Sequence, residues 1–210
     1  MGTKKKETLI HFNRSNIIES AKKLFQTKGV EQTTMDDIAK DADYSKSTIY
    51  VYFKSKDEIY NSIACEYMNL LKDRLEECTI NLDGFEVCYY KICNTIVGFQ
   101  EQFPLYFETL VGEINVDPEQ IEDDNILKEI YNTGEEINDI IAKILQLGID
   151  NQFIRKDIEL IPTVFYLWSA ISGIILMAER KRKYLELRMG LSLEDYLNYS
   201  FKMLLRSIIN

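Results

Sequence analysis

The sequence predicts an all-α protein, with a small three-helix head at its N-terminus and a larger helical body behind it. Three prolines and nine glycines in 210 residues leave few positions that would break a helix. β-branched residues do not alternate with polar ones over any long stretch, as they would in a strand with one buried face. Apolar residues recur instead at helical spacing along most of the chain.

The first predicted helix covers about residues 13–28, behind a lysine-rich segment expected to form a flexible basic arm over residues 1–12. Gly29 follows directly, where helices often end on a residue in the left-handed conformation. Five apolar residues of this segment have the spacing of one helix face: Ile17, Ile18, Ala21, Leu24 and Phe25.

Two short helices joined by a tight turn are predicted next. Thr34 and Asp37 have the spacing of a capping box, with a hydroxyl at the N-cap and a carboxylate three residues later. The turn follows at Asp43, because aspartate is one of the few residues that tolerate a left-handed conformation. The second short helix is expected over about residues 46–53.

The body is expected to hold five or six further helices. Ser55 and Glu58 form another capping box, which predicts a longer helix from residue 56 onward. Asp83 and Glu86 indicate a helix that reaches about residue 103, and Pro104 starts or breaks the next one. The remaining helices are predicted over three ranges: about 126–147, 158–186 and 193–208, the last capped by Ser192 with Asp195.

Charge is distributed unevenly between the head and the body. Residues 1–60 hold 11 Lys/Arg against 9 Asp/Glu, whereas the other 150 residues hold 14 against 25, within a total net charge of −9. Eight acidic residues and no basic ones lie between Glu101 and Asn125. A mildly basic head on an acidic body suits a protein that docks one end on a polyanion.

The sequence gives no sign of a catalytic, metal or cofactor site. His11 is the only histidine, which excludes histidine-based triads and metal sites built from several histidines. The chain also lacks a phosphate-cradling glycine loop and a G-x-S-x-G motif. An enzyme is therefore not expected.

The cysteines and the N-terminus indicate a reduced, cytoplasmic protein. The first twelve residues lack the apolar core of a secretory signal. No C-x-x-C pair occurs, so the cysteines are interpreted as small buried apolar groups, with a redox-sensing pair as the alternative. The four are Cys65, Cys78, Cys88 and Cys93.

One segment, Leu160–Ala178, runs for 19 residues without a charge and is followed by three basic residues. This length and this flank fit a membrane span. Pro162 and Gly173 dilute its apolar character, and a deeply buried core or dimer helix has the same composition. The residues alone leave both interpretations open.

The two short helices and the preceding longer one have the organisation of a helix-turn-helix, in which the second short helix enters the major groove. Small polar side chains and a cation at the front of that helix suit contact with base edges: Ser45, Lys46, Ser47 and Thr48. Hydroxyl groups, a further cation and helix N-termini around it suit contact with phosphates: Thr34, Tyr50, Tyr52 and Lys56.

At these residues the chain resembles the TetR family of transcriptional regulators, over about a quarter of its length. The segment AKKLFQTKGVEQTTMDDIAKDADYSKSTIYVYFKSKDEIY carries the resemblance, including its Tyr-x-Tyr-Phe-x-x-Lys ending. Asp43 stands where the family usually has glycine, and Tyr44, Ser47 and Val51 also depart from the common pattern. Since Ser47 and Val51 lie on the DNA-facing helix, the operator sequence does not follow from the resemblance.

The resemblance implies a homodimer that pairs through its last two long helices, about 158–186 and 193–208, and binds palindromic DNA. It assigns the uncharged segment to the dimer rather than to a membrane. It further implies a flexible arm over residues 1–12, a DNA-binding domain over 13–60, and an effector-binding and dimerisation domain over 61–210. Repression is the family's usual mode of control.

The resemblance also implies a small hydrophobic effector, which releases DNA by favouring another conformation of the dimer. Aromatic residues at helical spacing are common in a core, but they can also line the pocket of such an effector. The predicted lining residues are Tyr67, Tyr89, Phe103, Tyr106, Tyr131, Phe165 and Trp168. The alternative is control by a protein partner that contacts the acidic segment 101–125.

Overall fold

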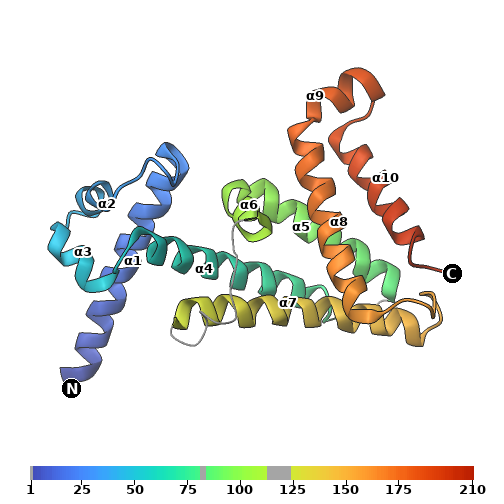
Figure 1. The fold of residues 1–210 in the computed structure, drawn as a ribbon. Coiled ribbons are helices and arrows are strands. Elements are labelled where there is room, and N and C mark those ends of the chain that lie inside the picture. Colours follow the sequence, from blue (N-terminus) through green and yellow to red (C-terminus); the bar gives the residue numbers. More distant parts are fainter. Residues whose placement is uncertain (1, 81–83, 113–123) are drawn as a thin grey trace. The chain divides into compact units, whose positions relative to one another are not determined.

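The computed structural model describes residues 2–80, 84–112 and 124–210, and these residues confirm the all-α prediction (Figure 1). The described helices are α1 (Gly2–Lys28), α2 (Met35–Asp41), α3 (Lys46–Tyr52), α4 (Lys56–Glu77), α5 (Phe85–Gln102), α6 (Pro104–Gly112), α7 (Asn125–Asp150), α8 (Leu160–Arg180), α9 (Arg182–Tyr184), the π-helical η1 (Leu185–Met189) and α10 (Leu193–Arg206). The predicted cap at Asp83 and most of the acidic segment at 117–125 lie outside the described residues.

The chain forms two compact units. The first comprises Met1–Tyr67 and Val116–Ile130, and the second comprises Met68–Asn115 and Tyr131–Asn210. Helices α4 and α7 each contribute residues to both units.

In the first unit, α1, α2 and α3 pack against one another around a small apolar core. Both short helices turn their isoleucines inward, as the helical spacing predicts. The fully buried side chains of this core come from all three helices and from the start of α4: Ile17, Ala21, Phe25, Ile38, Ile49, Phe53, Ile59 and Ile63.

The N-terminus differs from the prediction, because α1 begins at Gly2 and replaces the expected flexible arm. No proline or glycine interrupts residues 3–28, so the helix extends toward the N-terminus one hydrogen bond at a time from the part packed in the core. Side chains 6–12 are exposed, which explains why no apolar stripe marked this extension in the sequence.

In the second unit, α5 packs against α6 and α8, and α8 packs against α10. The Tyr89 hydroxyl on α5 donates a hydrogen bond of 2.9 Å to the carbonyl of Phe201 on α10. All four cysteines are free and buried, as predicted. Apolar side chains buried around α5 and α8 include Ile92, Ile96, Phe99, Phe107, Ile171, Ile175 and Phe201, and Tyr106 on α6 is buried as well.

Helix α7 continues past the predicted end near residue 147 to Asp150. Gly148 lies inside this last part, and a Cβ atom there would come within 2.6 Å of Ile154 and 2.9 Å of Phe85. The missing side chain therefore lets the segment after the helix fold back closely. Gln152, with φ of 58°, makes the turn.

The helix predicted over 158–186 ends early, at Arg180. The next residue, Lys181, has φ of −113° and ψ of 17°, and the short helix α9 and the π-helical turn η1 follow. Gly190, with φ of 66°, then redirects the chain into α10. Basic residues gather at this end of α8, from Arg180 to Lys183, where the negative end of the helix dipole favours them.

Helix α8 is, among the described helices, the one long and apolar enough to cross a membrane by length and composition alone, and 33% of its most apolar window is buried. A helix at the core or at an interface of a water-soluble protein has the same composition.

Candidate nucleic-acid interface

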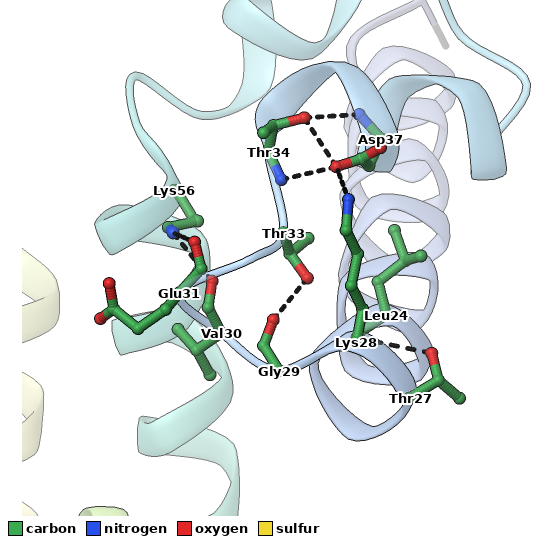
Figure 2. Close-up of polar contacts among 10 residues, drawn as sticks. All are labelled: Leu24, Thr27, Lys28, Gly29, Val30, Glu31, Thr33, Thr34, Asp37 and Lys56. Atoms are coloured by element: carbon green, nitrogen blue, oxygen red, sulfur yellow. Dashed lines mark hydrogen bonds and ion pairs between the residues drawn. The ribbon is translucent and has the colours of Figure 1, made fainter.

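Helix α2 begins with the predicted capping box (Figure 2). The Thr34 hydroxyl accepts a hydrogen bond of 3.1 Å from the Asp37 backbone N–H. The Asp37 carboxylate in turn accepts bonds from the Thr34 backbone N–H at 2.9 Å and from its hydroxyl at 2.7 Å. These bonds fix the first turn of α2.

Asp37 also joins α2 to α1, because Lys28 Nζ lies 2.6 Å from its Oδ2 atom (Figure 2). The bond from Lys28, together with those from Thr34, lowers the pKa of Asp37 below its ordinary value. The ionised carboxylate thus holds the helix-turn-helix against the longer helix behind it.

The turn between α2 and α3 is made at the predicted residue. Asp43 has φ of 58°, in the left-handed region, and the Tyr44 N–H donates a 2.9 Å bond back to the Ala39 carbonyl. The family that the chain resembles usually has glycine at this position, and glycine adopts such a conformation without steric cost. Aspartate is one of the few other residues that tolerate it.

Three hydroxyl groups gather at the start of α3. Ser45 is the N-cap, and its Oγ accepts a 3.1 Å bond from the Thr48 N–H. The same oxygen lies 2.8 Å from Ser47 Oγ and 2.7 Å from Thr48 Oγ1. Ser45 therefore orders the helix start, while the other two hydroxyls retain capacity for further bonds.

Lys46, the predicted cation of this helix, forms an ion pair with Asp36 on α2, at 2.7 Å. Both side chains are more than half exposed. The hydrogen bond and the charge of Asp36 raise the pKa of Lys46. This partner was not predictable from local spacing, because Asp36 lies on another helix, ten residues before Lys46.

The two tyrosines differ in their surroundings. Tyr50 is exposed, whereas the Tyr52 hydroxyl accepts a 2.7 Å bond from Asn13 Nδ2. Asn13 also accepts a 2.8 Å bond from the Tyr44 hydroxyl, so it bridges the two ends of the α3 segment. No local pattern marks Asn13 in the sequence, since its partners lie 31 and 39 residues away.

Arg14 supports the end of α3 as well. One guanidinium nitrogen donates a 2.5 Å bond to the Tyr52 carbonyl, and the group lies 4.0 Å from the centre of the Phe53 ring. The Arg14 side chain on α1 thus positions the end of α3.

Lys56, predicted to contact phosphate, has backbone partners in the structure (Figure 2). Its ammonium donates to the carbonyls of Val30 at 2.8 Å and Glu31 at 3.4 Å. The side chain thereby ties the start of α4 to the loop between α1 and α2. This structural role was not visible in the sequence.

One face of α3 is left exposed opposite the buried Ile49. It carries Lys46, Ser47, Tyr50 and Val51, and the Val51 side chain is 77% exposed. An exposed helix face on a helix-turn-helix, with hydroxyls and a cation at its front, is the geometry that enters a major groove.

Residues 17–63 match the family model described as bacterial regulatory proteins, tetR family. The chain carries the N-terminal head of the TetR family. The TetR-family head is 42% identical over 59 residues to the biofilm operon icaADBC HTH-type negative transcriptional regulator IcaR of Staphylococcus aureus, and 39% identical over 61 residues to the uncharacterized HTH-type transcriptional regulator YhgD of Bacillus subtilis. These matches cover 27% and 29% of this chain and 32% of each relative, so the chain spans about a third of their length.

Solved structures resemble the chain beyond the TetR-family head. A TetR/AcrR-family transcriptional regulator from Thermobifida fusca aligns with 91% of this chain and 96% of its own, at a TM-score of 0.69 and 20% identity. The ketosteroid transcriptional regulator KstR2 of Mycobacterium tuberculosis aligns with 94% and 95%, at a TM-score of 0.67 and 16% identity. At these identities the likeness establishes the fold alone, a helix-turn-helix head followed by a larger helical body.

The seven residues predicted to line an effector pocket lie in different surroundings in the structure. Tyr131 and Phe165 are exposed, at 44% and 72%, which corrects their assignment to an internal lining. Helical spacing identified them as members of a stripe but did not show that the stripe faces outward.

The other five occupy different surroundings. Tyr67 belongs to the first unit, where Lys22 Nζ lies 5.6 Å from its ring centre. Phe103 packs against Phe99 at 5.3 Å between ring centres, and Tyr106 is buried. Among the described residues, Tyr89 and Trp168 border one cavity, which measures about 20 Å³.

Proposed function

We propose that the chain is a homodimeric transcriptional repressor that acts in the cytoplasm and binds a palindromic DNA operator through the TetR-family head. The observation that carries this proposal is the exposed face of α3, which begins at a cluster of three hydroxyl groups. Residues 13–60 are the proposed DNA-binding domain, extended by the first turns of α1, and 61–210 the proposed dimerisation and control domain.

Within the TetR-family head, the front of α3 is proposed to contact base edges and its surroundings to contact phosphates. Lys46 and Ser47 are exposed enough to reach bases directly, while Ser45 and Thr48 act from the helix start. The proposed phosphate contacts are the exposed hydroxyl of Tyr50, the hydroxyl of Tyr52, the N-terminus of α2 at Thr34 and the ammonium of Lys56.

The direct test is fluorescence anisotropy with DNA from upstream of the protein's own gene, over a series of salt concentrations. Saturable binding by a dimer, much tighter than binding to random DNA, supports the proposal. Binding that is weak, equally strong for all sequences and abolished by moderate salt contradicts specific recognition of that DNA.

We propose that α8 and α10 form the dimer contact, because large apolar side chains on both helices are exposed. Such a patch on one surface of a monomer is typical of an interaction site. Small residues at 169 and 173 on the same exposed face of α8 would let a second helix approach closely. The exposed apolar side chains are Ile161, Phe165, Tyr166 and Met177 on α8, and Tyr199 and Met203 on α10.

Gly173→Arg tests this contact, since a Cβ atom at Gly173 would meet nothing within 4 Å in the monomer. We expect sedimentation velocity to show monomers for this variant and dimers for the wild type. Gly98→Arg on α5 is the matched control, because a Cβ atom there also meets nothing within 4 Å. A Gly173→Arg protein that remains fully dimeric would contradict the assignment of α8.

Control of DNA binding by a small hydrophobic ligand bound among the predicted aromatic residues requires the cavity that Tyr89 and Trp168 border to enlarge. The cavity that Tyr89 and Trp168 border measures about 20 Å³ and accommodates about one water molecule, whereas small-molecule pockets span roughly 300–1,000 Å³. This packing supports a second candidate, control by a protein partner that contacts the acidic segment 101–125.

A compound screen separates the two candidates. Release of bound operator together with a change in Trp168 fluorescence supports ligand control, because Trp168 borders the cavity that the ligand would enlarge. Operator release by an added protein, with no release by any compound, supports the partner.

A further inference from the structure

We propose that the corner between α8 and α10 is a binding site for a small organic anion with a single carboxylate and a compact apolar body. A cavity of about 300 Å³ lies there, at the lower end of the range for small-molecule sites. Seven described residues line it: Met177, Ala178, Lys181, Tyr184, Leu185, Met189 and Tyr196. The site belongs wholly to the second unit and does not depend on DNA binding by the head.

The cavity has a fixed floor and adaptable walls. Ala178 and Leu185 are buried beneath it, at 1% and 4% exposure. Met177 and Met189 stand at its sides and are about half exposed in the single chain, where Met177 also lies at the end of the proposed dimer contact, so the site borders that contact. Methionine side chains are unbranched and polarisable, so they can close around apolar groups of different shape. An apolar body bound between them would cover surface that is otherwise in contact with water.

The charge of the cavity selects an anion. Lys181 is the one charged residue among the described lining residues. Two carboxylates of this region have other partners: Glu179 forms bonds of 2.8 and 3.0 Å with Arg182, and Asp195 accepts a bond from Ser192 at the start of α10. A ligand carboxylate at this lining residue would be the complement of its ammonium.

The surrounding segment reinforces this preference. Residues 180–188 contain five basic residues and one acidic residue, Glu186, although the chain as a whole has a net charge of −9. A local positive potential on an otherwise acidic protein attracts anions to this corner. A single lysine with three flexible donors suits one carboxylate, whereas a bidentate clamp for a larger phosphate group would favour arginine.

The backbone here is unusual in a way that shapes the cavity. Leu185 and Met189 are the two ends of the π-helical turn η1, and both line it. The Leu191 N–H donates a 3.2 Å bond back to the Leu185 carbonyl, across the left-handed Gly190. π-Helical turns occur frequently at functional sites, and this one supplies two of the lining residues.

The test uses the full-length protein with methyl-labelled methionines and sodium octanoate as the probe, followed by NMR. We expect saturable shifts of the Met177 and Met189 methyl signals, while that of Met35 in the head stays unchanged. 1-Octanol serves as the neutral probe of equal length. Absence of saturable shifts at millimolar octanoate, or equal shifts of all methionines, would overturn the proposal.

Two lysine substitutions that each remove one positive charge distinguish direct contact with the ligand from general electrostatic attraction to this segment. Lys181→Gln should weaken octanoate binding about fivefold and leave octanol binding unchanged, whereas Lys183→Gln, outside the lining, should change neither. Met189→Glu at the exposed wall should weaken octanoate binding at least tenfold without affecting the fold. Equal effects of Lys181→Gln and Lys183→Gln would contradict a built site, and circular dichroism checks each variant for folding.

Discussion

Lys46 and Asp36 form an ion pair of 2.7 Å between the front of α3 and the first turn of α2. The proposed base-contacting cation is thus held by a carboxylate on the same exposed surface. To reach DNA, Lys46 must leave this partner, and Asp36 then stands near a polyanion.

Replacing Asp36 should therefore strengthen DNA binding. Asp36→Asn frees Lys46 and removes a charge that repels phosphate. We therefore expect tighter binding to all DNA sequences. The affinity should also fall more steeply as the salt concentration rises. Fluorescence anisotropy with operator and random DNA measures both. Asp57→Asn, which removes a charge at the start of α4, is the control for net charge. Unchanged or weaker binding by Asp36→Asn alone would contradict this interpretation.

Lys56 is expected to contribute to folding as well as to DNA binding. Lys56→Ala removes the bonds to the carbonyls of Val30 and Glu31, which should lower the free energy of unfolding by about 1 kcal/mol and loosen the loop before α2. DNA affinity should fall equally for all sequences, and the salt dependence should become shallower, because a phosphate contact is lost. Lys46→Ala should instead change sequence preference with little effect on stability. If both variants lowered stability and affinity alike, the two lysines would not have the separate roles proposed.

Asp37 predicts a pH dependence of the head's stability. Its pKa is lowered from 3.8 by Lys28 and Thr34, so its ionised form stabilises the fold at pH values above 3.8. This stabilisation is lost as the pH falls from 3.8 through the lowered pKa of the folded state. The difference in free energy of unfolding between the wild type and Asp37→Asn should thus be constant at neutral pH and shrink below pH 3.8.

A double-mutant cycle with Lys28→Met isolates the ion pair from the capping bonds. We expect the coupling between Lys28 and Asp37 to disappear in acid together with the effect of Asp37→Asn. A coupling that persists at the lowest pH at which the protein stays folded would show that the charge of Asp37 is not its source.

The short helices of the head were predictable because their signals are local. The capping box at Thr34 and the left-handed Asp43 fix where α2 starts and where it turns into α3. The partners of Lys46 and Lys56 were not predictable, because those contacts join residues 10 and 26 positions apart and depend on how the helices pack.

The predictions for the body that were wrong failed for a similar reason. Helical spacing shows that Phe165 belongs to a stripe, yet only the packing of α8 shows that this stripe is exposed. The break at Lys181 was missed because no glycine or proline marks it. The extension of α1 to Gly2 was missed because side chains 6–12 are exposed and form no apolar stripe.

The cysteines should be unreactive in the folded protein, which tests the redox-sensing alternative. Burial raises the pKa of Cys93 to about 12, and the Cys88 and Cys93 side chains are both at 0% exposure. Because the neutral thiol of Cys93 is favoured in the folded state, its contribution to stability is complete below pH 9.0 and decreases as the pH rises toward 12. At pH 8, a thiol-reactive disulfide reagent should label none of the four cysteines within minutes, while the same protein in urea should show four reactive thiols. Rapid labelling of any thiol in the folded protein would indicate an accessible thiolate and would support a redox role. Cys65 and Cys78, which are slightly exposed, would then be the first cysteines to replace by serine.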